Sequence, residues 1–361
     1  MVEGKGSTLR KILLSLLVFG FLFGVANMPA EAAEYNWKMG MPWPVPVQDQ
    51  FHKQFIELVK EYSKGKIEIT YYPDGQLGTH DEIFHSVQDG SVEIGYFAPY
   101  VNLVPGGILN WMPWTVTSWE EAKRAFDRKE GILWEMMEKA YNEVGMTMFY
   151  QVSYGPYGLG NNVRPLTSPA DLKNLKLRVS ASLGLVRMLQ NMGKGSGMTL
   201  ETIPWGDLYD ALGKGVVDGC WSMWPSLVEL RHSEVLKYYS DLNFAWDMNN
   251  VVFNKEKWDA LPKDLQDAVV KAAEETQAAL FANSAKVQEE FIATLKKMEG
   301  FEITFLTDEQ REAFRKASDM GPIWDELAKP WLDKNYPGQN MTVKVQEELE
   351  KIHQEALASK K

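Results

Sequence analysis

Cysteine and histidine are scarce in this chain of 361 residues. Cys220 is the single cysteine, so no internal disulfide can form. There are only five histidines, and their spacing matches no metal-ligand pattern. The chain also lacks a nucleophile elbow, a phosphate-binding loop and a dinucleotide-binding fingerprint. These absences leave no pattern that predicts an enzyme, and we expect neither a metal nor a cofactor.

Long apolar runs are absent after the N-terminus. Residues 1–33 resemble a secretory signal with a basic start, an apolar run and a small-residue cleavage site. These parts are Lys5, Arg10 and Lys11, then residues 12–25, then Ala30 to Ala33. The apolar run is shorter than the roughly 20 residues that a membrane span needs, so we predict cleavage rather than anchoring. The mature protein is expected to be exported, soluble and periplasmic.

An excess of positive charge is also missing. Without residues 1–33 the chain loses three of its 38 basic and two of its 49 acidic residues, which leaves 35 against 47 and a net charge of −12. Such a surface argues against nucleic acid or anionic lipid as a partner. If the ligand is an anion, a local site has to attract it.

Alternating strands and helices predict an α/β fold. Residues 36–97 follow the order strand–helix–strand–helix–strand, which favours largely parallel pairing. We predict a helix over 119–142, a strand over 146–152, and a helix over about 262–299 that is far longer than average. The glycine-rich stretch Tyr154 to Gly160 is typical of a crossing between two lobes.

Two similar segments point to two lobes of similar build. Residues 87–93 and 212–218 both end a helix at glycine and begin a strand with valine and then a carboxylate. Glycine at a helix C-terminus readily takes the left-handed conformation that other residues resist.

Arg178 follows a short helix-to-strand switch. Ser168 can cap a helix that starts at Pro169 and ends near Asn174, before the alternating strand 175–179. Arg178 then lies on the face opposite the apolar side chains of this strand. It can be a bidentate donor for an anion or a solvated edge-strand arginine.

Taken in order, several segments resemble the solute-binding proteins of tripartite ATP-independent periplasmic (TRAP) transporters, the DctP type. The matching segments cover most of the mature chain: residues 75–78, 87–93, 168–179, Pro204-Trp205 with Tyr209, 215–219, and Asn254 with Trp258 and Pro262. The resemblance implies two α/β lobes joined by a hinge, a long helix spanning both, and a small organic anion in the cleft. We expect residues 34–154 plus about 244–283 in lobe I, and 155–243 plus about 284–361 in lobe II.

The resemblance also implies site residues. The family's signature arginine, which holds a ligand carboxylate by two parallel bonds, falls on Arg178. Its aromatic contact falls on Trp205, and a usual polar contact on Ser222. Trp221 stands where the family often has a carboxylate, which argues against metal-assisted binding. A second arginine of the sialic-acid branch would fall near Gly158, which argues against that substrate.

Further candidates come from their predicted positions at strand ends, where such clefts form. These are Trp43, Tyr100, Tyr157 and, more weakly, Gln48. Trp221 and Trp224 can either narrow the pocket or pack inside the lobe.

The predicted function is therefore capture of a small carboxylate or sulfonate and its delivery to the small and large membrane subunits of a TRAP transporter, by a protein expected to be monomeric. One alternative is a ligand-sensing protein that feeds a signalling receptor. An exported hydrolase is a second alternative, although it would need a nucleophile–base pair that the sequence does not indicate.

Overall fold

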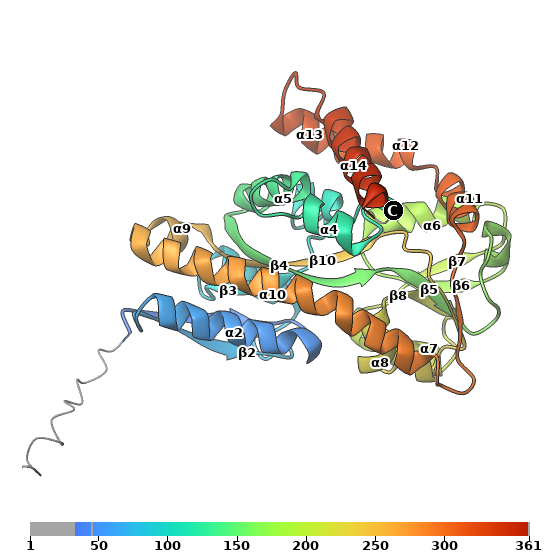
Figure 1. Cartoon of the computed structure of the whole chain (residues 1–361), viewed down its shortest axis with the longest axis horizontal. Helices are drawn as coiled ribbons and strands as arrows, with labels where there is room; N and C mark the ends of the chain where they lie inside the picture. The colour runs from blue at the N-terminus through green and yellow to red at the C-terminus, as the bar shows by residue number, and fades with distance from the viewer. Residues whose placement is uncertain (1–32, 45, 360–361) are drawn as a thin grey trace, which may run out of the picture.

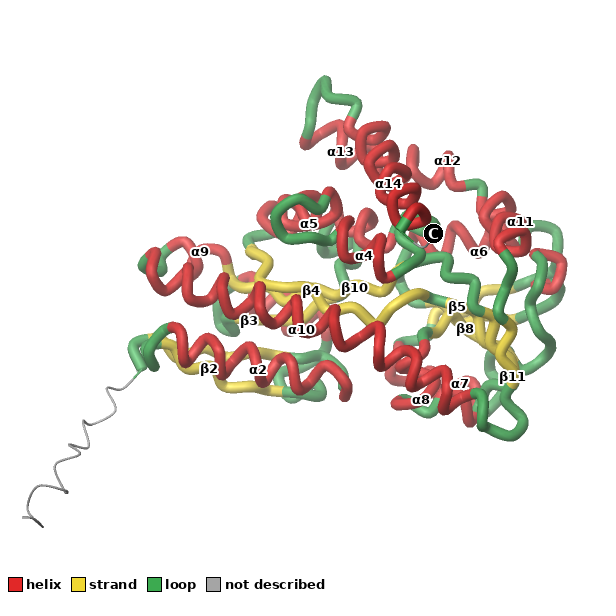
Figure 2. Tube along the Cα trace, viewed as in Figure 1, coloured by secondary structure: helices red, strands yellow, loops and turns green. Residues whose placement is uncertain are grey.

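Two mixed β-sheets form the frame of the protein, and the chain passes from one sheet to the other through short links between strands (Figures 1 and 2). The computed structural model describes residues 33–44 and 46–359. The predicted signal segment lies outside these residues, apart from Ala33. No helix of the described segments is both long and apolar enough to span a bilayer.

The first sheet has the strand order β2-β1-β3-β10-β4. Its strands are β1 (Tyr35–Gly40), β2 (Ile67–Tyr72), β3 (Ile94–Phe97), β4 (Met146–Pro156) and β10 (Trp246–Asn254). The second sheet has the order β11-β9-β5-β8-β6-β7. Its strands are β5 (Gly158–Asn161), β6 (Lys176–Val179), β7 (Thr199–Thr202), β8 (Gly219–Ser222), β9 (Tyr238–Ser240) and β11 (Glu302–Thr304).

The parallel pairing predicted for residues 36–97 is confirmed, since β1 pairs in parallel with β2 and β3, but each sheet also contains antiparallel pairs. Strands β2-β1-β3 are parallel in the first sheet and β7-β6-β8 in the second, but β10 and β5 run antiparallel to both of their neighbours. The chain crosses from the first sheet to the second between β4 and β5, and returns between β9 and β10. Every antiparallel pair includes β5 or β10, the strand that follows one of these two crossings. A strand that enters from the other sheet needs no helical crossover and can therefore pair antiparallel.

One set of helices lies around the first sheet. They are α2 (Pro46–Tyr62), α3 (His80–Gln88), η1 (Pro105–Trp111), α4 (Trp119–Ala125), α5 (Ile132–Glu143) and α9 (Lys255–Asp259). The single helix predicted over 119–142 is wrong, because the chain leaves the helix after α4 and re-enters it at Ile132. Asp127 causes the break: its carboxylate accepts hydrogen bonds from the backbone N–H groups of Lys129 and Glu130, at 2.9 Å each.

The remaining helices follow β5. They are η2 (Pro169–Leu172), α6 (Leu183–Met192), η3 (Trp205–Asp207), α7 (Leu208–Gly213), α8 (Trp224–Glu229), η4 (His232–Glu234), α10 (Lys263–Leu295), α11 (Asp308–Ser318), α12 (Met320–Ile323), η5 (Trp324–Ala328), α13 (Lys329–Asn335) and α14 (Met341–Ala358). The predicted long helix is confirmed as α10. It contacts α2 and β4 beside the first sheet and α8 beside the second, and Figure 1 shows it running across both.

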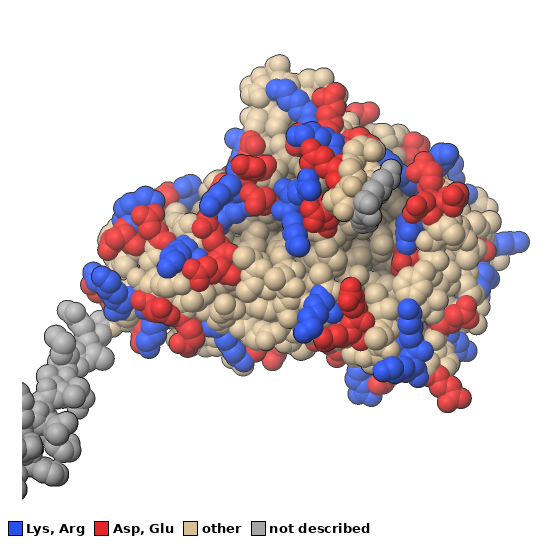
Figure 3. All heavy atoms as spheres, viewed as in Figure 1, with Lys and Arg blue, Asp and Glu red and all other residues tan. Residues whose placement is uncertain are grey.

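The C-terminal helices contact elements around both sheets. Helix α11 packs against α6, whereas α14 packs against α4 and α5, and α13 against η1. The lobe boundaries expected from the sequence stay a prediction. On the face shown in Figure 3, acidic and basic side chains are interspersed rather than gathered by sign.

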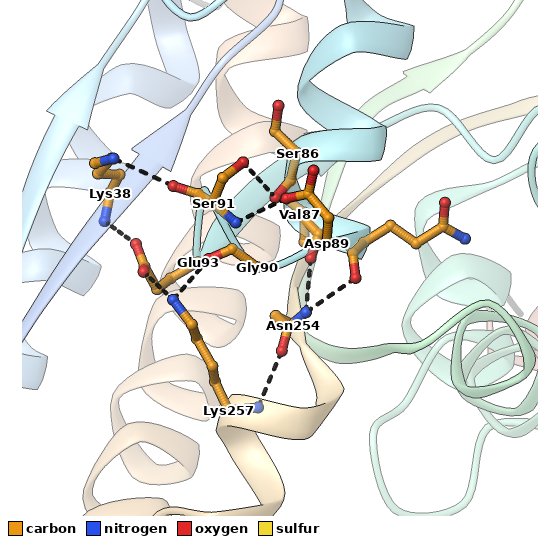
Figure 4. A network of polar contacts seen from close by, with 10 residues as sticks. Lys38, Ser86, Val87, Asp89, Gly90, Ser91, Glu93, Asn254 and Lys257 are labelled. Carbon is orange, nitrogen blue, oxygen red and sulfur yellow. Dashed lines mark hydrogen bonds and ion pairs between the residues drawn. The ribbon is translucent and has the colours of Figure 1, made fainter.

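The turn after α3 is fixed by a polar network (Figure 4). Asn254, at the end of β10, donates from its side chain to the carbonyls of Val87 (2.9 Å) and Gln88 (3.2 Å). The Glu93 carboxylate accepts the Lys38 backbone N–H at 2.8 Å and pairs with Lys257. Helix α3, this turn and strand β3 are thereby held to β1 and β10.

The similarity between residues 87–93 and 212–218 corresponds to a repeated structural device. Gly90 and Gly215 both have positive φ, at 80° and 66°. In the second copy the Asp218 carboxylate accepts the Lys176 backbone N–H of β6 at 2.8 Å, as Glu93 does in β1. Both parallel halves are therefore built on a helix, a left-handed glycine, and a carboxylate that fixes the central strand.

Candidate functional site

A pocket lies between the two sheets, next to the crossings. It contains about 670 Å³ of empty space, part of which is open to solvent. Trp43 and Tyr100 line it from loops of the first sheet, and Arg178 and Trp221 from strands of the second. Tyr157 lines it from the link between β4 and β5. Here the two crossings are hydrogen-bonded, since the Tyr157 N–H donates to the Ala245 carbonyl at 2.8 Å.

Arg178 is placed by the predicted switch into β6. Asn174 has the left-handed conformation (φ 59°) that turns the chain from η2 into the strand. The side chain of Arg178 is only 1% exposed. Its Nε donates to the Ile203 carbonyl at 2.8 Å, while Nη1 is buried without a hydrogen-bond partner. The guanidinium carbon lies 5.2 Å from the ring centre of Trp205 and 5.9 Å from that of Trp221.

The electrostatics of Arg178 favour an anion. Burial lowers the pKa of the guanidinium, and among the described residues no carboxylate forms an ion pair with it. A guanidinium has five N–H donors and no acceptor. One end of this fork is held by Ile203, so the unpartnered end is free to bind an anionic oxygen in the pocket.

Aromatic rings form a wall of the pocket on the side of the first sheet. The Trp43 ring stacks on His80, with the ring centres 5.5 Å apart and the planes within 4° of parallel. Tyr100 packs against the same histidine at 5.0 Å and against Trp111 at 5.7 Å. This wall can cover an apolar or flat part of a ligand.

Two carboxyl groups also line the pocket. Asp247, near the start of β10, is 3% exposed and accepts the Tyr157 hydroxyl at 2.7 Å. Burial raises its pKa to about 7. Burial also raises the pKa of Glu229, the last residue of α8, to about 7. A hydrogen bond from the Val47 backbone lowers this pKa by a smaller amount. The pocket therefore contains titratable groups of both signs.

A comparison with known protein families decides the classification. The model for the bacterial extracellular solute-binding proteins of family 7, DctP, matches residues 44–330. The chain belongs to the DctP family.

Relatives of this DctP-family protein match along most of their length. The sialic acid-binding periplasmic protein SiaP of Vibrio cholerae is 26% identical over 325 residues, covering 89% of this chain and 95% of SiaP. The C4-dicarboxylate-binding periplasmic protein DctP of Rhodobacter capsulatus is 25% identical, covering 76% and 81%. A crystal structure of a TRAP periplasmic solute-binding protein from Ochrobactrum anthropi is 25% identical, covers 90% and 98%, and superposes with a TM-score of 0.78. The predicted family and two-lobed α/β fold are confirmed.

Six of the eight residues that the sequence singled out line this pocket of the DctP-family protein: Trp43, Tyr100, Tyr157, Arg178, Trp205 and Trp221. Gln48 and Ser222 do not. Gln48 is buried and donates to the Ser153 carbonyl at 3.4 Å. Ser222 is buried behind the pocket, 3.4 Å from the His232 Nδ1 atom. Trp224 packs in the core against Tyr239 instead of facing the pocket.

Sequence reasoning missed both carboxyl groups and Asn249. The predicted strand began near Asn249, whereas β10 begins at Trp246 and so includes Asp247. A signal was present, because residues 247–250 place an aspartate and two asparagines inside a strand that is otherwise apolar. Polar side chains in a fully buried strand need partners or a ligand, so this cluster could have been singled out.

A metal-ligand cluster and a nucleophile–base pair are two arrangements that catalysis commonly uses. Within residues 33–44 and 46–359, no group of three metal-ligating side chains could hold an ion. Ser222 and His232 form a serine–histidine contact near the pocket, but Ser222 does not line it. Burial and the nearby Arg178 charge lower the pKa of His232 to about 4, and burial raises the pKa of Cys220 to about 12.

Proposed function

We propose that this protein is a periplasmic solute-binding protein that captures a small organic anion, a carboxylate or a sulfonate, with Arg178. The observation that carries the proposal is the buried guanidinium with one nitrogen unpartnered inside a pocket. Two relatives support it, since one is a sialic acid-binding protein and the other a C4-dicarboxylate-binding protein. The protein acts by binding and not as an enzyme.

Binding begins with the lobes apart. The acid group of the ligand docks on the free end of Arg178, and the aromatic wall of Trp43 and Tyr100 covers the rest of it. Closure about the paired crossings at Tyr157 and Ala245 then excludes water, which strengthens the charged hydrogen bonds. The ligand favours the closed state by the difference between its affinities for the two states.

We infer that the closed protein delivers its ligand to the small and large membrane subunits of a TRAP transporter, and that it works as a monomer. Gly158 argues against a ligand that needs a second arginine there. A Cβ at this position would meet the Ser240 carbonyl oxygen at 2.5 Å, so a larger side chain would require the backbone to move.

The test is a thermal-shift screen of the mature protein against organic acids and sulfonates, followed by calorimetry with each compound that raises the melting temperature. Arg178→Ala should weaken binding about 100-fold or more, because two charge-assisted hydrogen bonds are lost. Arg187→Ala is the matched control, since that arginine is exposed and pairs with Glu326 outside the pocket. Binding by Arg178→Ala within about threefold of wild type would overturn the proposal.

A further inference from the structure

Asp247 is a buried acid without a cationic partner. Its hydrogen bonds come from neutral groups: the Tyr157 hydroxyl at 2.7 Å and the Asn249 side-chain N–H at 3.4 Å and 3.5 Å. Among the described residues, no lysine, arginine or histidine forms an ion pair with it. A carboxyl group removed from water to this extent keeps its proton more readily unless a positive charge or further donors reach it, so a cation that binds beside it favours the ionised form.

Arg178 lies in the same pocket and is also unpaired, so the two groups do not neutralise each other. Tyr157 interacts with both groups. Its hydroxyl donates a hydrogen bond to Asp247, and the positive charge of Arg178 acts on the same hydroxyl. The two groups also come from different sheets, Arg178 from β6 and Asp247 from β10. A ligand that crosses the pocket can therefore meet a cation at one end and a carboxylate at the other.

The surroundings of Asp247 suit a positive charge. Trp43, Tyr100 and Trp111 line the same pocket, and aromatic rings attract cations most strongly where water is excluded. Glu229 adds a second carboxyl group to the lining. A second acid group on the ligand would instead meet two carboxyl groups, neither of which forms an ion pair among the described residues.

We propose that the ligand is a zwitterion, whose carboxylate or sulfonate binds Arg178 and whose cationic nitrogen binds Asp247 among the aromatic rings. This inference rests on the proposed function and narrows its ligand class. It explains why a pocket of an anion-binding protein contains a buried acid that the protein itself leaves unpaired.

The test compares ligands of equal shape that differ in one charge. The pairs are glycine betaine with 3,3-dimethylbutanoate, and 4-(trimethylammonio)butanoate with 5,5-dimethylhexanoate, in which a carbon replaces the quaternary nitrogen. Calorimetry on the mature protein should show at least one zwitterion binding about tenfold or more tightly than its isostere. Asp247→Asn should reduce that ratio to about threefold or less by weakening the zwitterion alone, and Glu326→Gln, outside the pocket, should leave it unchanged.

The outcomes separate this inference from the proposed function. If organic anions bind through Arg178 but no zwitterion exceeds its isostere, the zwitterion proposal is overturned and the proposed function stands. If Asp247→Asn folds and leaves the ratio intact, the assignment of Asp247 is overturned. If neither the pairs nor the organic-acid screen gives binding, both proposals fail. The wild-type comparison decides the ligand class even if the variant does not fold.

Discussion

The stability of the ligand-free protein should depend on pH through Asp247. Burial raises the pKa of this carboxyl from 3.8 to about 7 in the folded protein. Between these values the folded state keeps a proton that the unfolded chain releases, so the free energy of unfolding falls as pH rises. At 1.36 kcal/mol per pKa unit the full effect is about 4 kcal/mol, of which roughly 3 kcal/mol lies between pH 5 and pH 8.

Asp247→Asn should remove this dependence and leave the geometry intact. The asparagine oxygen can still accept the Tyr157 hydroxyl, which is 2.7 Å from Asp247 Oδ1. We therefore expect the variant to gain stability relative to wild type from pH 5 to pH 8. Glu229 shifts in the same direction but is present in both proteins, so its effect cancels.

Urea unfolding followed by circular dichroism, in the absence of ligand, measures this difference at each pH. The difference in unfolding free energy between Asp247→Asn and wild type should grow by roughly 3 kcal/mol from pH 5 to pH 8. Glu326→Gln, an exposed carboxylate variant outside the pocket, should show no such growth. A difference that is equal at the two pH values would refute the claim that burial raises the pKa of Asp247 in the folded protein.

Three further predictions concern other residues. Arg178→Met should abolish ligand binding. In urea titrations it should also raise the unfolding free energy of the ligand-free protein by about 1–2 kcal/mol, because a buried unpaired charge is removed. A variant less stable than wild type would contradict this. Cys220, with its raised pKa, should react with a thiol reagent at pH 8 only after urea is added, and rapid labelling of the native protein would count against its burial. Asn254→Ala should lower the unfolding free energy by about 1–2 kcal/mol through the lost cap and carbonyl contacts, while calorimetry gives an unchanged ligand affinity.

Local signals in the sequence predicted much of this fold. The segment from Ser168 to Val179 forms its short helix and strand as expected, because a cap, a proline and a left-handed asparagine act on their own neighbours. The break between α4 and α5 is also local, but the helical spacing of apolar residues on either side concealed it. At Gly131 a Cβ would meet the Asp127 backbone nitrogen at 2.4 Å, so Asp127 and Gly131 together mark the turn.

The pocket was only partly predictable, because its two halves come from distant strands. Arg178 and Trp205 belong to segments with a family pattern, and Trp43 and Tyr100 follow predicted strand ends. The polar residues at 247–250 mark Asp247 as unusual but do not place it in the pocket, since its position depends on where β10 begins and on the pairing of Trp246 with Pro156. That pairing joins residues far apart in the chain, and periodicity within one strand cannot reveal it.

The separation of charges across the pocket bears on how closure is driven. A ligand with a single acid group gains its strongest contact from Arg178 on the second sheet, and that contact forms whether or not the first sheet closes over it. A ligand with both charges also binds Asp247 on the first sheet, and only the closed state satisfies both ends at once. Because a ligand shifts a two-state equilibrium by its differential affinity alone, the second charge favours closure beyond what the aromatic wall contributes. If the proposed zwitterion is the ligand, Asp247→Asn should therefore reduce closure more than it reduces docking.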